Sequence, residues 1–577
     1  MHLHRKLHVF KALALGAGLL SFSSAYALNP VAPPNSDAGA LQRQLEQNMP
    51  LPMPQLRRQP ETAVEPLKEI VGATVTVSRF KFVGNTLVSS EKLAELLQSY
   101  LNKPVGFAQL QQATQVISEA YRAQGWVVRV YLPKQEIEKG EVTIQIVEAV
   151  FGKVSITGEQ TPHVQAQRLV AIVQRAQPAG TVVRRANIDR ALLLLDDLPG
   201  VAVTGNLNEG EQSGETDLVL SVTNEPWLSG NVSTDNTGSR STGIERLSGN
   251  FNVSSPLKQG DAVAVNLLKT LGSEYERLAY SFPLGFEGWR SGAHMTHLHY
   301  SLLGSFAGFY GTSDTAGLDL SYPLVRSQMT NVNLQMGWDG KHFFNVASTG
   351  TASDYSLSVA NASLNANQMD SWAGGGTNNA SLGLTHGKVN LNGSPNQSTD
   401  AASANTAGAY NKLSVSLNRL QTLTENLSAY VAFNMQRANR NLDSSEKLYL
   451  GGANGVRAFP SGEGGGAQGQ TLTAELRQRL NASYTLTGFY DYGRATAYKD
   501  NNYADGSAKL NSGAFANSYA LRGFGVALTW AVASGSEIKA SLARRASDNP
   551  LANTTTGMDG DGTKFMNRIW VSASMSF

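Results

Sequence analysis

The chain has 577 residues, a length that suffices for three or four domains of ordinary size. It contains no cysteine, which excludes disulfides and any cysteine-based metal or nucleophile site. The net charge of +2 depends on Arg5, Lys6 and Lys11, because the other 44 basic residues (47 minus these 3) face 45 acidic ones. A nearly neutral chain gives no indication of nucleic-acid binding.

Residues 1–27 have the pattern of a secretory signal peptide. The basic stretch "MHLHRKLHVFK" precedes an apolar run, Ala12–Phe22, and Ala25-Tyr26-Ala27 matches a small-x-small cleavage site. The apolar run is shorter than the roughly 20 residues that a membrane-spanning helix needs. We therefore expect export across a bacterial inner membrane, followed by cleavage, rather than an N-terminal anchor.

Residues 28–72 are rich in Pro, Gln and Ala and are predicted to be a linker. One short helix is expected around Ala38–Asn48, where Leu41 and Leu45 are one helical turn apart.

Two similar units follow, residues 73–149 and 150–226, with a period of about 74 residues. Each has the order β-α-α-β-β. In the first, the strand "SRFKFVGN" precedes two helical patterns, and the strands "WVVRVYL" and "EVTIQIVEA" close the unit. Each unit is predicted to be a small α+β module with one thin core.

From Trp227 to the end, apolar residues alternate with Ser, Asn, Thr and Gln, as in "NVNLQMG" and "NLSAYVAFNMQ". This pattern predicts strands with one apolar and one polar face. In lipid only a closed barrel satisfies every strand edge, and residues 227–577 accommodate about 16 strands at about 22 residues each. We predict a transmembrane antiparallel β-barrel, with a soluble β-sandwich as the alternative. Residues 345–410, rich in Asn, Gly, Ser and Ala, are expected to supply long loops.

Two stretches suggest an interaction inside this barrel: the glycine-rich "GGANGVRAFPSGEGGG" (451–466) and the strand "LTGFYDYGRA" (486–495). Alternation places Asp491 on the polar face, where a carboxylate needs water or a cation. Arg457, on a loop long enough to fold back into the lumen, is the candidate partner because its guanidinium can bind a carboxylate through two hydrogen bonds. We expect a wetted pair that contributes about 1 kcal/mol. The alternative is that Arg457 is exposed in an extracellular loop.

The motifs "VRAF" (Val456–Phe459) and "FYDYG" (Phe489–Gly493) resemble the paired motifs of two-partner-secretion translocators, the TpsB proteins of the haemolysin secretion/activation (ShlB/FhaC/HecB) type. The order of signal peptide, short helix, two POTRA modules, barrel and terminal Phe is also similar, so the resemblance covers essentially the whole mature chain. It implies a loop-to-wall contact between Arg457 and Asp491, within a motif that also includes Val456, Phe459, Phe489 and Gly493. Ala458 differs from the Gly found there in much of the superfamily, which puts the backbone of the loop tip in doubt.

The resemblance further implies an outer-membrane pore whose POTRA modules, in the periplasm, receive an unfolded exoprotein of haemolysin, haemagglutinin or adhesin (TpsA-like) type. The expected physical means is β-augmentation, in which an extended segment joins an exposed strand edge. The pore would release this partner at the surface or into the medium, with activation of the cargo left open. By the same resemblance, Ala38–Asn48 would be a plug, and Phe577 a C-terminal signal for the barrel-insertion machinery.

No catalytic or cofactor site is expected. The sequence has no G-x-S-x-G arrangement. Gly464-x-Gly466-x-x-Gly469 precedes a strand rather than a helix and so does not indicate dinucleotide binding. His297 and His299 share a strand face without a third ligand nearby, which does not indicate a metal site.

Two other functions remain as alternatives. The first is a barrel-assembly factor of the same superfamily, although such factors generally carry more POTRA modules than the two that fit before Trp227. The second is a barrel enzyme, such as an outer-membrane protease or phospholipase, which would leave the two modules unexplained.

Overall fold

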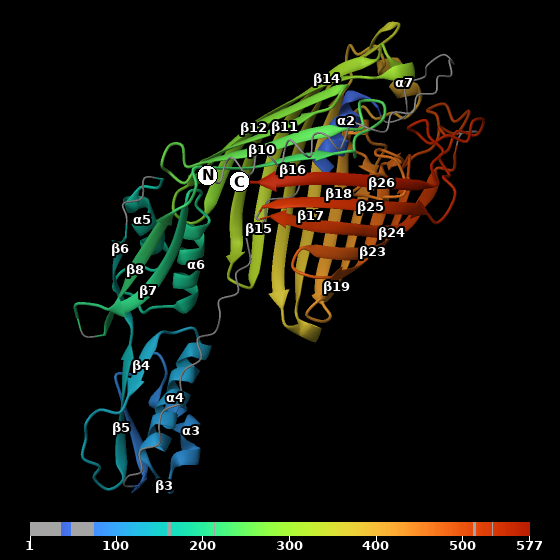
Figure 1. Ribbon diagram of the computed structural model, residues 1–577. Coiled ribbons are helices and arrows are strands. Elements are labelled where there is room, and N and C mark those ends of the chain that lie inside the picture. The colour runs from blue at the N-terminus through green and yellow to red at the C-terminus, as the bar shows by residue number, and fades with distance from the viewer. Residues whose placement is uncertain (1–35, 48–73, 159–162, 213, 512–514, 534) are drawn as a thin grey trace.

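The computed structural model describes residues 36–47, 74–158, 163–212, 214–511, 515–533 and 535–577. The predicted signal peptide and most of the predicted linker lie outside the described residues. Figure 1 shows two small α+β modules in a row, followed by a large barrel with one helix, α2 (Ala38–Gln47), in its interior. Among the described residues, no helix is both long and apolar enough to cross a membrane.

The first module is a three-stranded sheet in the order β2-β5-β4, covered by two helices. Strand β5 alternates inward Val142, Ile144 and Ile146 with more exposed residues, as its sequence requires. The elements of this module are β1 (Val75–Thr76), β2 (Arg79–Val83), α3 (Ser90–Leu96), η1 (Gln98–Tyr100), β3 (Pro104–Val105), α4 (Phe107–Ala123), β4 (Val128–Tyr131) and β5 (Glu141–Glu148).

The second module repeats this arrangement, with the sheet order β6-β8-β7. A single residue, Ala149, separates β5 from β6, and the modules are joined at Val127, whose N–H donates to the Val183 carbonyl at 3.3 Å. Arg184 also lies over the Trp126 ring at 4.3 Å. The elements are β6 (Val150–Thr157), α5 (Ala166–Ala176), α6 (Arg185–Asp196), β7 (Val201–Glu209) and β8 (Glu215–Asn224).

Sixteen strands form the closed barrel, each antiparallel to its neighbours. The predicted fold class, a barrel of about 16 strands behind two α+β modules, is confirmed. The barrel strands are β9 (Leu228–Asp235), β10 (Arg246–Ser254), β11 (Ala262–Lys269), β12 (Ser273–Leu284), β13 (Trp289–Ser301), β14 (Tyr310–Arg326), β15 (Thr330–Ala347), β16 (Gly350–Asp370), β17 (Gly376–Asn390), β18 (Gly408–Thr422), β19 (Leu427–Ala438), β22 (Gln468–Arg479), β23 (Tyr484–Thr496), β24 (Ser518–Ala533), β25 (Ser536–Arg545) and β26 (Asn567–Ser576).

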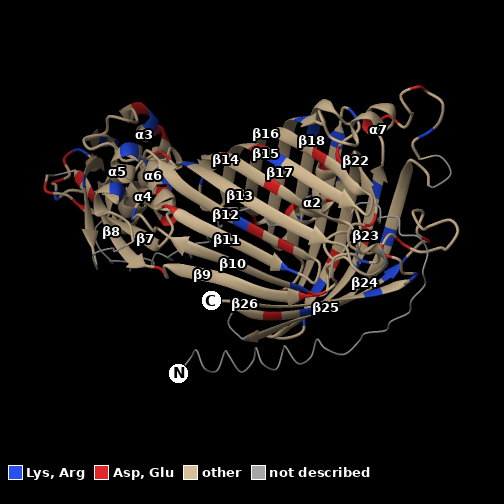
Figure 2. Cartoon of the chain, turned by 90° about the horizontal axis from the view of Figure 1, so that it is seen from above, with Lys and Arg blue, Asp and Glu red and all other residues tan. Residues whose placement is uncertain are grey.

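The two faces of the barrel wall differ in the way the alternation predicts. Large apolar side chains such as Met295, Leu318 and Ile569 are exposed on the outside, as lipid contact requires. Long stretches of the strands carry no charged residue, whereas the modules and the loop-bearing end of the barrel carry many (Figure 2). Inside, neutral polar side chains pair across strands: the Asn379 amide donates to Asn418 Oδ1 at 2.8 Å.

The expectation of long loops in residues 345–410 is wrong. Most of this stretch forms β16 and β17, and the connection between β17 and β18 spans only 391–407, including the short helix α7 (Gln397–Ala402). The reason is that the extracellular half of β16 has a reversed pattern, with Tyr355, Leu357 and Val359 buried inside. They join an apolar cluster that includes Leu41 of α2. The outward residues there are Ser, so composition alone resembles that of a loop.

The second module is fixed by arginines to the barrel turns that face it. The guanidinium of Arg326, at the end of β14, binds both carboxylate oxygens of Asp197 at 2.7 and 2.8 Å. Arg168 on α5 donates to the carbonyls of Pro283 and Gly285 at 3.0 and 2.9 Å. Charged, directional contacts of this kind give the module a defined position at the barrel mouth.

The barrel closes at a seam between β9 and β26, where the last residue takes part. Phe577 and Gly230 exchange two backbone hydrogen bonds of 3.0 Å, and the Phe577 ring lies 6.2 Å from that of Phe251. A Cβ on Gly230 would lie 2.7 Å from the Phe577 ring. Only glycine therefore allows this approach. Further along, the Asn236 side chain replaces a strand partner, accepting from the Val571 N–H at 2.8 Å and donating to the Ile569 carbonyl at 3.1 Å.

Gly230→Ala is expected to weaken the seam, because overpacking of this kind costs about 1–3 kcal/mol. The measurement is the temperature at which the folded barrel loses its fast mobility on semi-native electrophoresis. Gly488→Ala on β23 is the matched control, since a Cβ there meets nothing within 4 Å. Equal transition temperatures for the two variants would contradict this account of the seam.

Candidate functional site

Residues 439–467, which connect β19 to β22, fold into the lumen, and we call them the inward loop. The loop contains η4 (Ser444–Glu446) and two short paired strands, β20 (Leu448–Tyr449) and β21 (Gly465–Gly466). At its tip the Val456 N–H donates to the Leu450 carbonyl at 2.7 Å, which folds the glycine-rich segment back on itself. The structure therefore places the predicted loop inside the barrel rather than in solvent.

Arg457 lies at this tip and contacts Asp491 on β23 through three hydrogen bonds. Its backbone N–H and Nε donate to Asp491 Oδ2 at 3.1 and 2.8 Å, and Nη2 donates to Oδ1 at 2.7 Å. The guanidinium carbon also lies 3.5 Å from the centre of the Phe489 ring. This is a bidentate pair with a stacked aromatic, a geometry that arginine provides and lysine does not.

The pair is dry, which corrects the expectation of a wetted contact. The side chains of Arg457 and Asp491 are 7% and 1% exposed. Arg457 Nη1 also donates to Glu475 on β22 at 2.8 Å, and Arg477 binds the same carboxylate at 2.7 Å. Two guanidiniums thus balance two carboxylates. A buried charge without such a partner is strongly destabilising, so each group depends on the others.

Small residues on the wall make room for the loop tip. A Cβ on Gly493 would lie 3.0 Å from Val456, and one on Gly523 of β24 would lie 2.5 Å from the Cβ of Ala458. Ala458 is not among the described residues with a positive φ, so the alanine at this motif position is compatible with the backbone of the tip. Phe459 is fully buried in the same apolar cluster as Val456 and Phe489.

The structure thus brings Val456, Arg457, Phe459, Phe489, Asp491 and Gly493 together, while Phe577 lies apart at the seam. Three further partners of this site were not predicted from the sequence. Glu475 shares the inward face of "TLTAELR" with Thr471 and Thr473, so alternation could have identified it. Trp570, whose Nε1 donates to the Arg457 carbonyl at 2.7 Å, lies on the polar face of the last strand. Arg545, whose Nε donates to the Ala458 carbonyl at 3.3 Å, has no local signal.

Helix α2 occupies the lumen and is held against the wall by polar contacts. The Ala38 N–H donates to Asn345 Oδ1 on β15 at 2.9 Å, and the Gln42 amide donates to Thr315 on β14 at 3.0 Å. Glu46 lies 3.7 Å from the buried ammonium of Lys341. These polar contacts lie beside an apolar one, because Leu41 of the helix packs in the cluster formed with the wall.

The same helix contacts the inward loop. The Ser444 hydroxyl donates to Asp37 Oδ1 at 2.7 Å, and the Gln47 amide donates to the Tyr449 carbonyl at 3.2 Å. Beside them a cavity of about 820 Å³ is lined by α2, the inward loop and a wall rich in Ser, Thr and Asn that also includes Arg246. The helix and the loop therefore lie side by side in the lumen.

A closed barrel with two β-α-α-β-β modules at its mouth, an internal helix and an arginine-bearing inward loop defines an outer-membrane protein transporter with POTRA modules. The chain belongs to the family of the haemolysin secretion/activation protein ShlB/FhaC/HecB, whose sequence pattern matches residues 214–516. The pattern of the ShlB-type POTRA domain matches residues 75–149. The protein is therefore an outer-membrane transporter of two-partner secretion with its POTRA modules in the periplasm, and the predicted family, function and location are confirmed.

Individual relatives agree with this assignment. The chain is 25% identical over 584 residues to the heme/hemopexin transporter protein HuxB of Haemophilus influenzae, covering 98% of each chain. It is 24% identical over 449 residues to the outer membrane transporter CdiB of Dickeya dadantii, covering 73% of this chain and 77% of the relative. The solved structure of CdiB from Escherichia coli has a TM-score of 0.66 at 20% identity, covering 93% of this chain and 95% of that one, a likeness of fold. Membership of a transporter family favours a transporter over a barrel-assembly factor.

Arg457→Ala is expected to release the tip of the inward loop, because it leaves Asp491 buried without its partner, at a cost of about 3–5 kcal/mol. Limited trypsin digestion of the purified protein should then cut after Lys447, which is half-buried in the loop. Arg457→Lys retains the positive charge but loses the bidentate guanidinium, so trypsin should cut after Lys447 at a rate between those of the wild type and Arg457→Ala. The control is Arg494→Ala, an exposed arginine on the same strand as Asp491. If trypsin cuts after Lys447 no faster in Arg457→Ala than in the wild type, the Arg457–Asp491 pair does not hold the loop.

Proposed function

We propose that this transporter captures one large exoprotein, of haemolysin, haemagglutinin or adhesin type, in the periplasm and passes it unfolded through the barrel. In this proposal residues 1–27 are the cleaved signal peptide and residues 28–72 carry the plug helix and linker. Residues 73–149 and 150–226 are the two POTRA modules, and 227–577 the barrel. The protein performs no catalysis of its own and needs no cofactor.

The observation that carries the proposal is that an edge strand of the first module lies close to an edge strand of the second, which begins beside the barrel. Strands β4 and β7 are edges of their sheets, and Arg129 of β4 lies 3.7 Å from Glu209 of β7. At its other end β7 begins next to the barrel, where the Ser255 hydroxyl donates to the Pro199 carbonyl at 2.7 Å. An extended segment that adds to these edges by β-augmentation would be led from the first module to the barrel mouth.

Passage through the pore then requires the lumen to open. The plug helix and the inward loop both occupy the path, and we assign the Arg457–Asp491 pair the role of holding the loop at the wall until it moves. The wall beside them, rich in Ser, Thr and Asn with Arg246 as its cation, offers many neutral hydrogen-bonding groups, which suits the transit of a chain of mixed sequence. For biogenesis, we propose that Phe577 is the C-terminal signal for the barrel-insertion machinery, and that outer-membrane lipid surrounds the finished barrel.

The direct test compares the proteins in the medium and in the outer membrane of cells with the wild-type protein, without it, and with Arg457→Ala. Loss of one large exoprotein from the medium by about tenfold or more, with other barrel proteins unchanged, is the expected result; a tenfold change corresponds to about 1.4 kcal/mol. A parallel decline of many outer-membrane barrels would instead support a barrel-assembly factor.

A second test addresses the edge of β7. The Val203 N–H points away from β8, toward Asp196 at 3.4 Å, so the N–H of Leu207, four residues on, faces the same open edge. Leu207→Pro removes this donor without removing a bond to β8. The variant should reduce secretion about fivefold or more, because the added exoprotein segment would lose one hydrogen bond to β7, worth about 1 kcal/mol, and would meet the proline ring.

Leu207→Ala is the matched control for this variant, because it shortens the same side chain and keeps the N–H. Its secretion should remain near the wild-type level. Equal secretion by the two variants, at equal amounts of folded protein, would exclude β7 as the receiving edge.

A further inference from the structure

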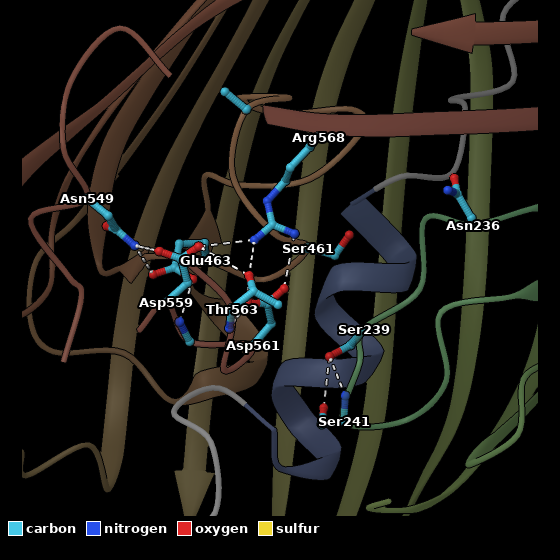
Figure 3. Close-up of polar contacts among 12 residues, drawn as sticks. Asn236, Ser239, Ser241, Ser461, Glu463, Asn549, Asp559, Asp561, Thr563 and Arg568 are labelled. Atoms are coloured by element: carbon cyan, nitrogen blue, oxygen red, sulfur yellow. Dashed lines mark hydrogen bonds and ion pairs between the residues drawn. The ribbon is translucent and has the colours of Figure 1, made fainter. Parts of the chain in front are cut away.

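Residues 460–464, the part of the inward loop that returns to the wall, pack against a buried polar cluster. No sequence motif predicted this cluster. The cluster joins these residues to the extracellular segment 546–566, between β25 and β26, and to the ends of both strands. Figure 3 shows Glu463, Asn549, Asp559 and Arg568 pointing toward one another. We call this set the arginine–carboxylate cluster; its members are Glu463, Arg545, Asn549, Asp559, Asp561, Thr563 and Arg568.

Asp559 is the centre of the cluster. Its Oδ2 accepts from the guanidiniums of Arg545 and Arg568, the latter at 3.1 Å, and its Oδ1 accepts from the Asn549 amide at 2.9 Å. The residue is 5% exposed. Arg545 on β25 and Arg568 on β26 thus bind the same buried carboxylate. Charge-assisted hydrogen bonds of this kind are stronger than those between neutral groups.

Glu463 connects this centre to the inward loop. Its Oε1 accepts from the Asn549 amide at 2.8 Å, and its Oε2 accepts from the Gly560 N–H at 2.9 Å. The residue is 4% exposed, and no Lys or Arg nitrogen of the described chain lies within ion-pair distance of its carboxylate. Burial accordingly raises the pKa of Glu463. Asn549 therefore bridges two carboxylates, one on the loop and one on the extracellular segment.

Arg545 also contacts the loop tip directly, which links the cluster to the Arg457 site. Its Nε donates to the Ala458 carbonyl at 3.3 Å, and its guanidinium lies 4.6 Å from the centre of the Phe459 ring. The loop is therefore held on two sides: by β22 and β23 through Arg457, and by β25 and the segment 546–566 through Arg545 and Glu463.

We propose that Asp559 and Glu463 are positioning residues that form a second anchor of the inward loop, through which the extracellular segment 546–566 sets how readily the loop leaves the lumen. The inference rests on the proposed role of the loop as a movable barrier. Release of the loop then requires the cluster to break or the segment 546–566 to move with it. Opening of the pore and rearrangement of an external loop become one event.

The test uses the purified full-length protein in planar lipid bilayers and measures the fraction of time that single channels spend open. Asp559→Asn and Glu463→Ala should each raise this fraction about tenfold, the effect of about 1.4 kcal/mol of lost anchoring. Glu463→Gln, which retains an acceptor for Asn549, should give a smaller increase. The matched control is Asp505→Asn in the extracellular segment 497–517, whose carboxylate accepts only from Ser507 among the described residues.

Semi-native electrophoresis of the same variants separates positioning from general stability. The second anchor is supported if the open fraction rises while the barrel keeps its wild-type transition temperature. It is overturned if Asp559→Asn and Glu463→Ala conduct like the wild type, or if the open fraction rises only in proportion to a loss of folded barrel. Because no exoprotein is present, failure of the proposed secretion function would appear in the secretion assay and not in this measurement.

Discussion

The interior of this transporter is organised around a carboxylate buried in the barrel wall. Asp491 is almost fully inaccessible, and a charge in that position is tolerable only with a partner that also satisfies its hydrogen-bonding capacity. Arg457 meets this need, but only because the inward loop brings it there. Three other features support this position of Arg457. The loop is rich in glycine, Gly493 leaves room for the loop tip, and Glu475 and Arg477 add a second pair of opposite charges beside it.

Sequence patterns sufficed where one face of a strand meets lipid and the other meets water. There the alternation predicted the barrel and the inward direction of Asp491, and the glycine-rich loop indicated Arg457 as its partner, as the motif resemblance also implied. The pattern failed at the far end of β16, where Tyr355 and Leu357 point inward to the cluster with Leu41 of α2 and the outward residues include Ser356 and Ser358. The arginine–carboxylate cluster was unpredictable for another reason: Glu463 and Asp559 are distant in sequence, and neither falls in an alternating segment.

The contents of the lumen are held by polar and by apolar contacts. Helix α2, the inward loop and the wall meet through hydrogen bonds and ion pairs, and also through two apolar clusters, one around Leu41 and one around Phe459. Polar contacts can be exchanged for water at little net change in free energy. The two apolar clusters and the buried Arg457–Asp491 pair, in contrast, oppose removal of the helix and the loop from the lumen.

The direct passage of β5 into β6 has a mechanical consequence. Only Ala149 lies between the two sheets, and the Val127 N–H is bonded to the Val183 carbonyl across the connection. These contacts restrict the motion of one module relative to the other, so the two form a stiff arm. The arm ends at Arg326 and Asp197 on the barrel rim. A pull on a polypeptide bound to the first module would therefore be transmitted along the arm as a torque on the barrel rim. The pulling force would then act on the turns that surround the pore.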